Sequence, residues 1–175
     1  DLLSQSEHDP TSQSILFTDD AAFADAVAAA VERQLPALST SAVARTSWDA
    51  NGAIIIVRDL EEAMPLVNAL APEHLELAVE DPEPLFAQVR HAGSVFLGRM
   101  TPEAVGDYVA GPNHVLPTGR RARFSSGLSV LDFMKRTSFL SLDRDAIGAI
   151  GPAAVALAQA EGLPAHAASV ALRLS

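Results

Sequence analysis

The run Ala53-Ile54-Ile55-Ile56-Val57 constrains the fold of this chain more than any other segment. Every side chain in it is apolar, whereas a strand with one face in water alternates polar and apolar residues. A continuous apolar strand is typical of a parallel sheet whose two faces are both covered by helices. The run therefore predicts a buried strand inside an α/β layer.

Strand and helix patterns alternate along the first 100 residues. Further strands are predicted at residues 14–18, 75–79 and 94–97, with a weaker one at 42–46. Helices are predicted after Asp20, after Asp59 with Glu62 placed to close a capping box, after Asp81-Pro82 and after Thr101-Pro102. This order predicts an α/β fold with an incomplete Rossmann-like, mostly parallel sheet flanked by helices. No G-x-G-x-x-G stands between a strand and a helix, so these residues lack the dinucleotide fingerprint.

The pattern changes from about Leu128, where strand signals fade and short Ala-rich helices follow. They are predicted at 130–134, at 145–161 with an interruption at Gly151-Pro152, and at 164–174. We therefore expect residues 1–127 to form the α/β part and residues 128–175 to form a helical C-terminal tail. The apolar faces of such a tail need another surface, and a partner subunit is a natural candidate.

Composition excludes several classes of function. Lys and Arg total 12 against 22 Asp and Glu, and this net charge of -10 argues against binding to nucleic acid or to anionic lipid. There is no cysteine, no apolar run long enough for a membrane span and no signal-peptide pattern. We expect a cytoplasmic protein. The chain begins without Met and inside a motif, so we expect a fragment, a processed piece or a truncated form.

Gln5 and His8 form a Gln-x-x-His pair, which places two neutral donors on one face of a helix. Asp107 can add a carboxylate and His166 a second imidazole, which makes a mixed nitrogen and oxygen set of the kind that zinc accepts. Taken singly, each residue has a plainer interpretation, because an exposed Gln, His or Asp near a helix is usually only solvated.

Glu73 and His74 are two candidate proton-transfer groups side by side. The plainer interpretation is a helix-ending turn with two polar residues in water. The pair also precedes its predicted strand, whereas ligands of open α/β sheets usually bind beyond the carboxyl ends of strands.

His114 and Glu161 are weaker candidates. His114 lies in the turn-forming stretch Gly111-Pro112-Asn113-His114, where a loop histidine without a role is the plain interpretation. Glu161 lies at the C-terminal end of its predicted helix, where a carboxylate opposes the helix dipole, and an unfavourable position is a mild indication of function.

Four separated segments, taken together, resemble histidinol dehydrogenase. They are residues 1–9, 71–76, 106–118 and 161–166. The resemblance runs from Asp1 to Ser175 in the family's order, and four motifs in order are far more specific than one. It covers only the C-terminal part of that family's chain, whose members are more than twice as long. Their nicotinamide-binding segment lies upstream of these residues.

The resemblance implies an NAD-linked oxidation of L-histidinol to L-histidine through the aldehyde, in histidine biosynthesis. It implies Zn²⁺ as a cofactor, and it implies His74 as the base for the alcohol proton and Glu73 as the group that activates water. The implied metal ligands are Gln5, His8, Asp107 and His166. The implied substrate contacts are Gln5, His8, His74, Asp107, His114, Glu161 and His166.

The resemblance also implies a homodimer in which the tail of each subunit completes the site of the other. Because the NAD-binding residues are expected upstream, this chain alone is not expected to be competent. Two alternatives stay open: a related zinc alcohol dehydrogenase for another polar alcohol, and a non-catalytic fragment that binds zinc or dimerises. Glu161 and His114 favour histidinol.

Overall fold

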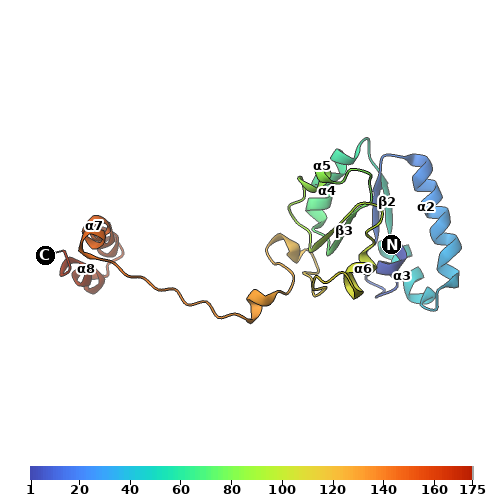
Figure 1. Cartoon of the computed structure of the whole chain (residues 1–175). Coiled ribbons are helices and arrows are strands. Elements are labelled where there is room, and N and C mark those ends of the chain that lie inside the picture. The colour runs from blue at the N-terminus through green and yellow to red at the C-terminus, as the bar shows by residue number, and fades with distance from the viewer. Residues whose placement is uncertain (175) are drawn as a thin grey trace. The chain divides into compact units, whose positions relative to one another are not determined.

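A computed structural model describes residues 1–174 and divides into two compact units, one of which is Asp1–Phe133 and the other begins at Met134. The first unit contains four strands with helices between them (Figure 1). The predicted division into an α/β part at 1–127 and a helical tail at 128–175, and the role of that tail, stay predictions.

The strands of the first unit form two parallel pairs. Strand β1 (Ile15–Thr18) pairs with β2 (Ala53–Ile56), with Ile15 opposite Ala53. Strand β3 (His74–Leu77) pairs with β4 (Ser94–Leu97), with His74 opposite Ser94. The predicted parallel α/β arrangement is confirmed, although within residues 1–174 the strands form two separate two-stranded sheets.

The helices of the first unit connect these strands and pack beside them. They are α1 (Leu2–Ser6), α2 (Ala21–Gln34), α3 (Ser41–Asn51), α4 (Leu60–Leu70), α5 (Glu83–Phe86) and α6 (Glu103–Tyr108), with 3-10 turns η1 (Leu35–Ala37), η2 (Arg121–Arg123) and η3 (Val130–Phe133). Helix α2 contacts β1 and β2, and α4 contacts β1. In Figure 1 the strands lie between α2 and α4, as expected for a sheet flanked by helices.

Two predicted helix caps are confirmed. The carboxylate of Asp20 accepts a hydrogen bond from the backbone N–H of Phe23 at 3.0 Å, and that of Asp59 accepts from Glu62 at 2.9 Å. Glu62 reaches back, but it accepts from the N–H of Arg58 at 2.8 Å and not from that of Asp59. The second half of the capping box therefore closes one residue earlier than predicted.

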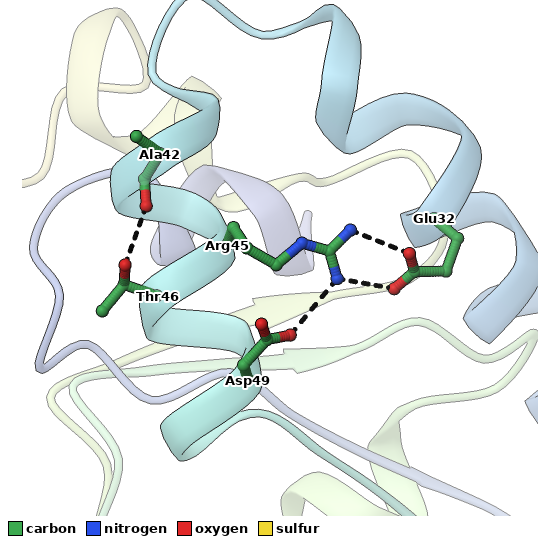
Figure 2. A network of polar contacts seen from close by, with 5 residues as sticks. All are labelled: Glu32, Ala42, Arg45, Thr46 and Asp49. Atoms are coloured by element: carbon green, nitrogen blue, oxygen red, sulfur yellow. Dashed lines mark hydrogen bonds and ion pairs between the residues drawn. The ribbon is translucent and has the colours of Figure 1, made fainter.

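The predicted weak strand at 42–46 is wrong, because these residues lie in α3. Ala44 and Ser47 are fully buried, and their spacing of three residues is helical. Arg45 joins α3 to α2 through two 2.8 Å contacts with the carboxylate of Glu32, and it also contacts Asp49 at 3.2 Å (Figure 2). Tertiary packing therefore overrides the weak strand preference of a short segment.

A small apolar core between α4, α5 and the second strand pair determines which way β3 faces. Its buried residues are Met64, Leu77 and Leu85, and Leu75 packs against them. Because side chains alternate along a strand, His74 and Glu76 belong to the opposite face from Leu75 and Leu77. That opposite face carries the candidate site.

The second unit is a helical pair, α7 (Arg144–Ala160) and α8 (Pro164–Ala171). The predicted interruption at Gly151-Pro152 is wrong, since α7 continues through both residues. Gly151 is buried, and a Cβ built there would lie 2.7 Å from Cδ2 of Leu174, so the helix is held by close packing at this point. Proline costs one helical hydrogen bond, which packing offsets here. No helix within residues 1–174 is long and apolar enough to cross a membrane.

Candidate metal and proton-transfer site

Strand β3 and helix α6 bring one imidazole and two carboxylates together. The Nε2 atom of His74 lies 3.8 Å from Oε1 of Glu103 and 3.9 Å from Oδ1 of Asp107. Glu103 and Asp107 are four residues apart on α6, so they share one face of that helix. Both distances exceed a hydrogen bond, so His74 converges with the two carboxyls without being hydrogen bonded to either of them.

Helix α6 is held tightly against the strands. Oε1 of Glu76 accepts a hydrogen bond from the backbone N–H of Glu103 at 2.7 Å. Gly106 lies on Phe96 of β4, where an added Cβ would come within 2.6 Å of the ring. The Phe96 ring also lies 6.0 Å from the His74 ring, tilted by 45°. Glu76, Gly106 and Phe96 together set the distance between α6 and His74.

His8 completes a group of candidate metal ligands. One ligand atom from each of His8, Glu103 and Asp107 lies within 4.8 Å of the others. His8 is exposed and follows α1, which ends at Ser6, so it lies in a turn. The structure therefore places Gln5 on α1 and His8 in the turn directly after it, and their joint part in a metal site stays a prediction. The buried Ser6 hydroxyl, hydrogen bonded to the carbonyl of Leu2, helps to hold this turn in place.

Burial makes the electrostatics of this group unusual. Glu103 is only 7% exposed. Burial, together with the neighbouring carboxyls of Asp107 and Glu76, raises the pKa of Glu103 to about 7. Oε1 of Glu103 and both ring nitrogens of His74 are buried without a hydrogen-bond partner among the described residues. Buried polar atoms usually have partners, so this group has unused capacity to bind a cation or a polar ligand.

The donor set fits a zinc ion chemically. Imidazole nitrogen and carboxylate oxygen are both ordinary zinc ligands. Bonds of about 2 Å place two donors of one ion within roughly 4 Å of each other. Small side-chain rotations would bring the atoms of His8 and Asp107 into that range, and a cation would also offset the repulsion between the carboxyls.

Gln5 and Glu73 lie next to this group in the sequence. Gln5 is half-buried on α1, and its backbone carbonyl lies 3.4 Å from the amide of His8. Glu73 directly precedes β3, and its backbone carbonyl accepts a hydrogen bond from Ser94 at 2.8 Å. Since β3 begins at His74, the Glu73-His74 pair spans the start of the strand and does not precede it entirely.

The three remaining predicted residues are exposed. His114 lies in the loop after α6. Glu161 follows α7 and His166 belongs to α8, and both line an open hollow of about 670 Å³ between these helices. The structure thus brings Glu161 and His166 together within the second unit, while their part in the metal and substrate set stays a prediction.

Sequence reasoning missed Glu103 and Glu76. The available signal for Glu103 was its spacing of four residues from Asp107 on a helix that Thr101-Pro102 predicted to begin there. The signal for Glu76 was its spacing of two residues from His74 on a strand, which places both on one face.

Comparison with known proteins finds relatives that match along the whole chain. The model of the family described as histidinol dehydrogenase matches residues 1–174. The histidinol dehydrogenase of Zymomonas mobilis is 67% identical over 175 residues, and that of Rhodospirillum rubrum is 63% identical over 176 residues. Each of these matches covers 100% of this chain and 41% of the relative.

The fold is also found in a solved relative. The crystal structure of histidinol dehydrogenase from Elizabethkingia anophelis matches with a TM-score of 0.91 and 39% sequence identity. That match covers 99% of this chain and 40% of the other. The chain therefore spans about 40% of the length of the relatives it matches.

Proposed function

Since this chain belongs to the histidinol dehydrogenase family, we propose that it forms the metal-binding part of an enzyme that oxidises L-histidinol to L-histidine through the aldehyde, with NAD as the acceptor. The observation that carries the proposal is the convergence of His74 with the carboxyls of Glu103 and Asp107, next to His8. NAD-binding residues are expected in the part of the relatives that this chain does not cover.

We propose zinc as the metal, held by Gln5, His8, Asp107 and His166. A bound zinc ion would supply a Lewis acid that orients the imidazole and amine of the substrate. The proximity of His8 to Asp107 supports this set. His166 would join it from the helical pair, where it lies beside Glu161.

His74 is the proposed base for the alcohol step. A carbon bearing a hydroxyl group gives up hydride readily only when the hydroxyl proton is removed, and imidazole is the most common group for that task. The ring of His74 is largely buried, and neither of its nitrogens is occupied by a hydrogen bond from the described residues. A nitrogen is therefore available to accept the proton, and the largely buried setting limits competing water.

Glu73 is the proposed base for the second half of the reaction, in which the aldehyde is hydrated before it is oxidised. A carboxylate can take one proton from the attacking water. The backbone of Glu73 is held by the hydrogen bond from Ser94, so its side chain starts from a well-defined point beside His74. His114 and Glu161 are proposed to recognise the substrate.

We propose that the working protein is a homodimer in which Glu161 and His166 serve a site built on the other subunit. Their shared hollow between α7 and α8 and their exposure support this arrangement, because a residue that reaches across subunits must be accessible from its own. The reaction is expected in the cytoplasm, and the net charge of -10 argues against nucleic acid as a partner.

The test uses a full-length family enzyme that contains this sequence. Zinc content is measured, and NADH formation is followed with L-histidinol, with histidinal and with other polar alcohols, including sulfonated diols. Oxidation of histidinol in two steps supports the proposal. Turnover of another alcohol alone would favour the related zinc dehydrogenase, and zinc binding without any turnover would favour a non-catalytic role.

A further inference from the structure

The proposed reaction leaves Glu103 without a role, although it is a buried charged residue beside the reacting groups. Burying a carboxyl group costs free energy unless it has a partner. Its Oε1 atom has no hydrogen-bond partner among the described residues, and it is directed at Nε2 of His74 from 3.8 Å. If Glu103 served only to stabilise the fold, its buried Oε1 atom would be expected to have a hydrogen-bond partner.

Two carboxyls approach the same nitrogen of His74, and they are not equivalent. Asp107 is the proposed metal ligand, so the lone pairs it offers to the metal are not free for His74. Glu103 is more buried than Asp107, and Glu76 fixes its backbone through the 2.7 Å hydrogen bond. When the metal is bound, Glu103 is therefore the carboxyl that remains available to accept a hydrogen bond from Nε2 of His74.

We propose that Glu103 is a positioning residue, which holds the imidazole of His74 in the orientation needed for proton transfer. The inference rests on the proposed function. A ring held through one nitrogen presents its other nitrogen to the substrate. In other proteins, carboxylates hold catalytic and metal-binding histidines in this way. Contacts of this kind are often long in a ligand-free site and shorten when the ligand binds.

The experiment compares two changes at Glu103 in the full-length enzyme. Glu103→Gln keeps the reach of the side chain and an accepting oxygen, but it removes the charge. Glu103→Asp keeps the charge, but it withdraws the carboxyl from His74. The matched control is Glu83→Gln, because Glu83 is also the first residue of a helix that follows a proline, yet it is exposed.

If Glu103 positions His74 by direct contact, the length of the side chain at this position should affect turnover more than its charge does. A misplacement of about 1 Å in a catalytic group can cost about 10²-fold in rate. We expect Glu103→Asp to lower kcat by about 10²-fold and Glu103→Gln by only about 10-fold, since hydrogen bonds to charged groups are stronger than neutral ones. KM for histidinol and zinc content should stay near the wild-type values in both. Glu83→Gln should match the wild type.

Other results would overturn the inference. If Glu103→Gln loses more activity than Glu103→Asp and also loses zinc, Glu103 is a metal ligand. If both variants turn over histidinol as fast as the wild type, His74 does not depend on Glu103. If Glu103→Asp does not fold, a loss of turnover by about 10²-fold or more in folded Glu103→Gln still contradicts positioning by reach. A wild-type enzyme that does not oxidise histidinol instead contradicts the proposed function.

Discussion

The Nε2 atom of His74 lies 3.9 Å from Oδ1 of Asp107, so a proposed proton-transfer group and a proposed metal ligand face each other across β3 and α6. The two residues are far apart in the sequence, and the packing of one short helix on one strand brings them together. Metal binding and the position of the His74 ring are therefore expected to influence each other.

Zinc content should depend on the histidines of the proposed metal set. His8→Ala and His166→Ala should each weaken metal binding sharply, because a tetrahedral site rarely survives the loss of an imidazole ligand. Metal analysis of the purified full-length variants measures this. His91→Ala is the matched control, since His91 is not part of the proposed set. Zinc content at the wild-type level in both His8→Ala and His166→Ala would contradict the proposed metal ligands.

His74 and Glu73 should affect different steps. His74→Ala should slow the oxidation of both the alcohol and the aldehyde, whereas Glu73→Gln should act mainly on the aldehyde step. General acid and base groups typically contribute about 10²–10⁴-fold. Stopped-flow measurement of the two half-reactions in the full-length enzyme separates them, and equal, small effects on both steps would remove the assignment.

Mixed dimers should recover activity if the tail serves the partner's site. A His8→Ala subunit and a His166→Ala subunit, each inactive alone, are mixed under conditions that allow exchange. In the swapped arrangement, one site of the mixed dimer carries both defects and the other carries neither. If each site is built within one chain, mixing restores nothing.

The metal-free protein should lose stability as pH rises through the titration of Glu103. Its pKa in the folded protein is about 7, above its ordinary value of 4.5. Between these values the folded state holds a proton that the unfolded state has released, so stability falls from about pH 4.5 to about pH 7 and then levels off. Thermal unfolding of wild-type and Glu103→Gln proteins between pH 5 and pH 8 measures it. The Tm of Glu103→Gln relative to that of the wild type should rise as pH rises. Parallel curves of Tm against pH for the two proteins would contradict the assignment.

Gly106→Ala should disturb both stability and the site. The new Cβ would meet the Phe96 ring at 2.6 Å, so α6 must move away from β4. Overpacking of this kind costs about 1–3 kcal/mol. Denaturant unfolding measures the loss, and zinc content should fall because Asp107 moves with the helix. Gly148→Ala is the control, since a Cβ there has no neighbour within 4 Å.

Several local features were predictable because a few neighbouring residues are enough to form them. The caps at Asp20 and Asp59 need only a side-chain oxygen and the N–H groups of the following turn. The strand at Ala53–Ile56 follows from its continuous apolar run, but its predicted burial on both faces is wrong, since the strand is only half-buried and Ile56 is 56% exposed. The order of the four motifs also indicates the family, and the match of the family model over residues 1–174 confirms it.

Other features depend on residues that are distant in the sequence, and only the tertiary structure decided them. Residues 42–46 are helical because Ala44 and Ser47 are buried and Arg45 reaches Glu32 on another helix. Helix α7 continues through Pro152, and the neighbouring Gly151 packs closely on Leu174.

The sequence by itself determined where His8, His74 and Asp107 stand along the chain and what chemistry each can offer. The tertiary structure decided that Glu103 joins them, since that depends on Gly106 letting α6 approach Phe96 and on Glu76 holding the first turn of α6. Spacing along a helix or strand specifies which residues share a face. Only packing between elements, through close contacts that no local pattern encodes, specifies which faces meet.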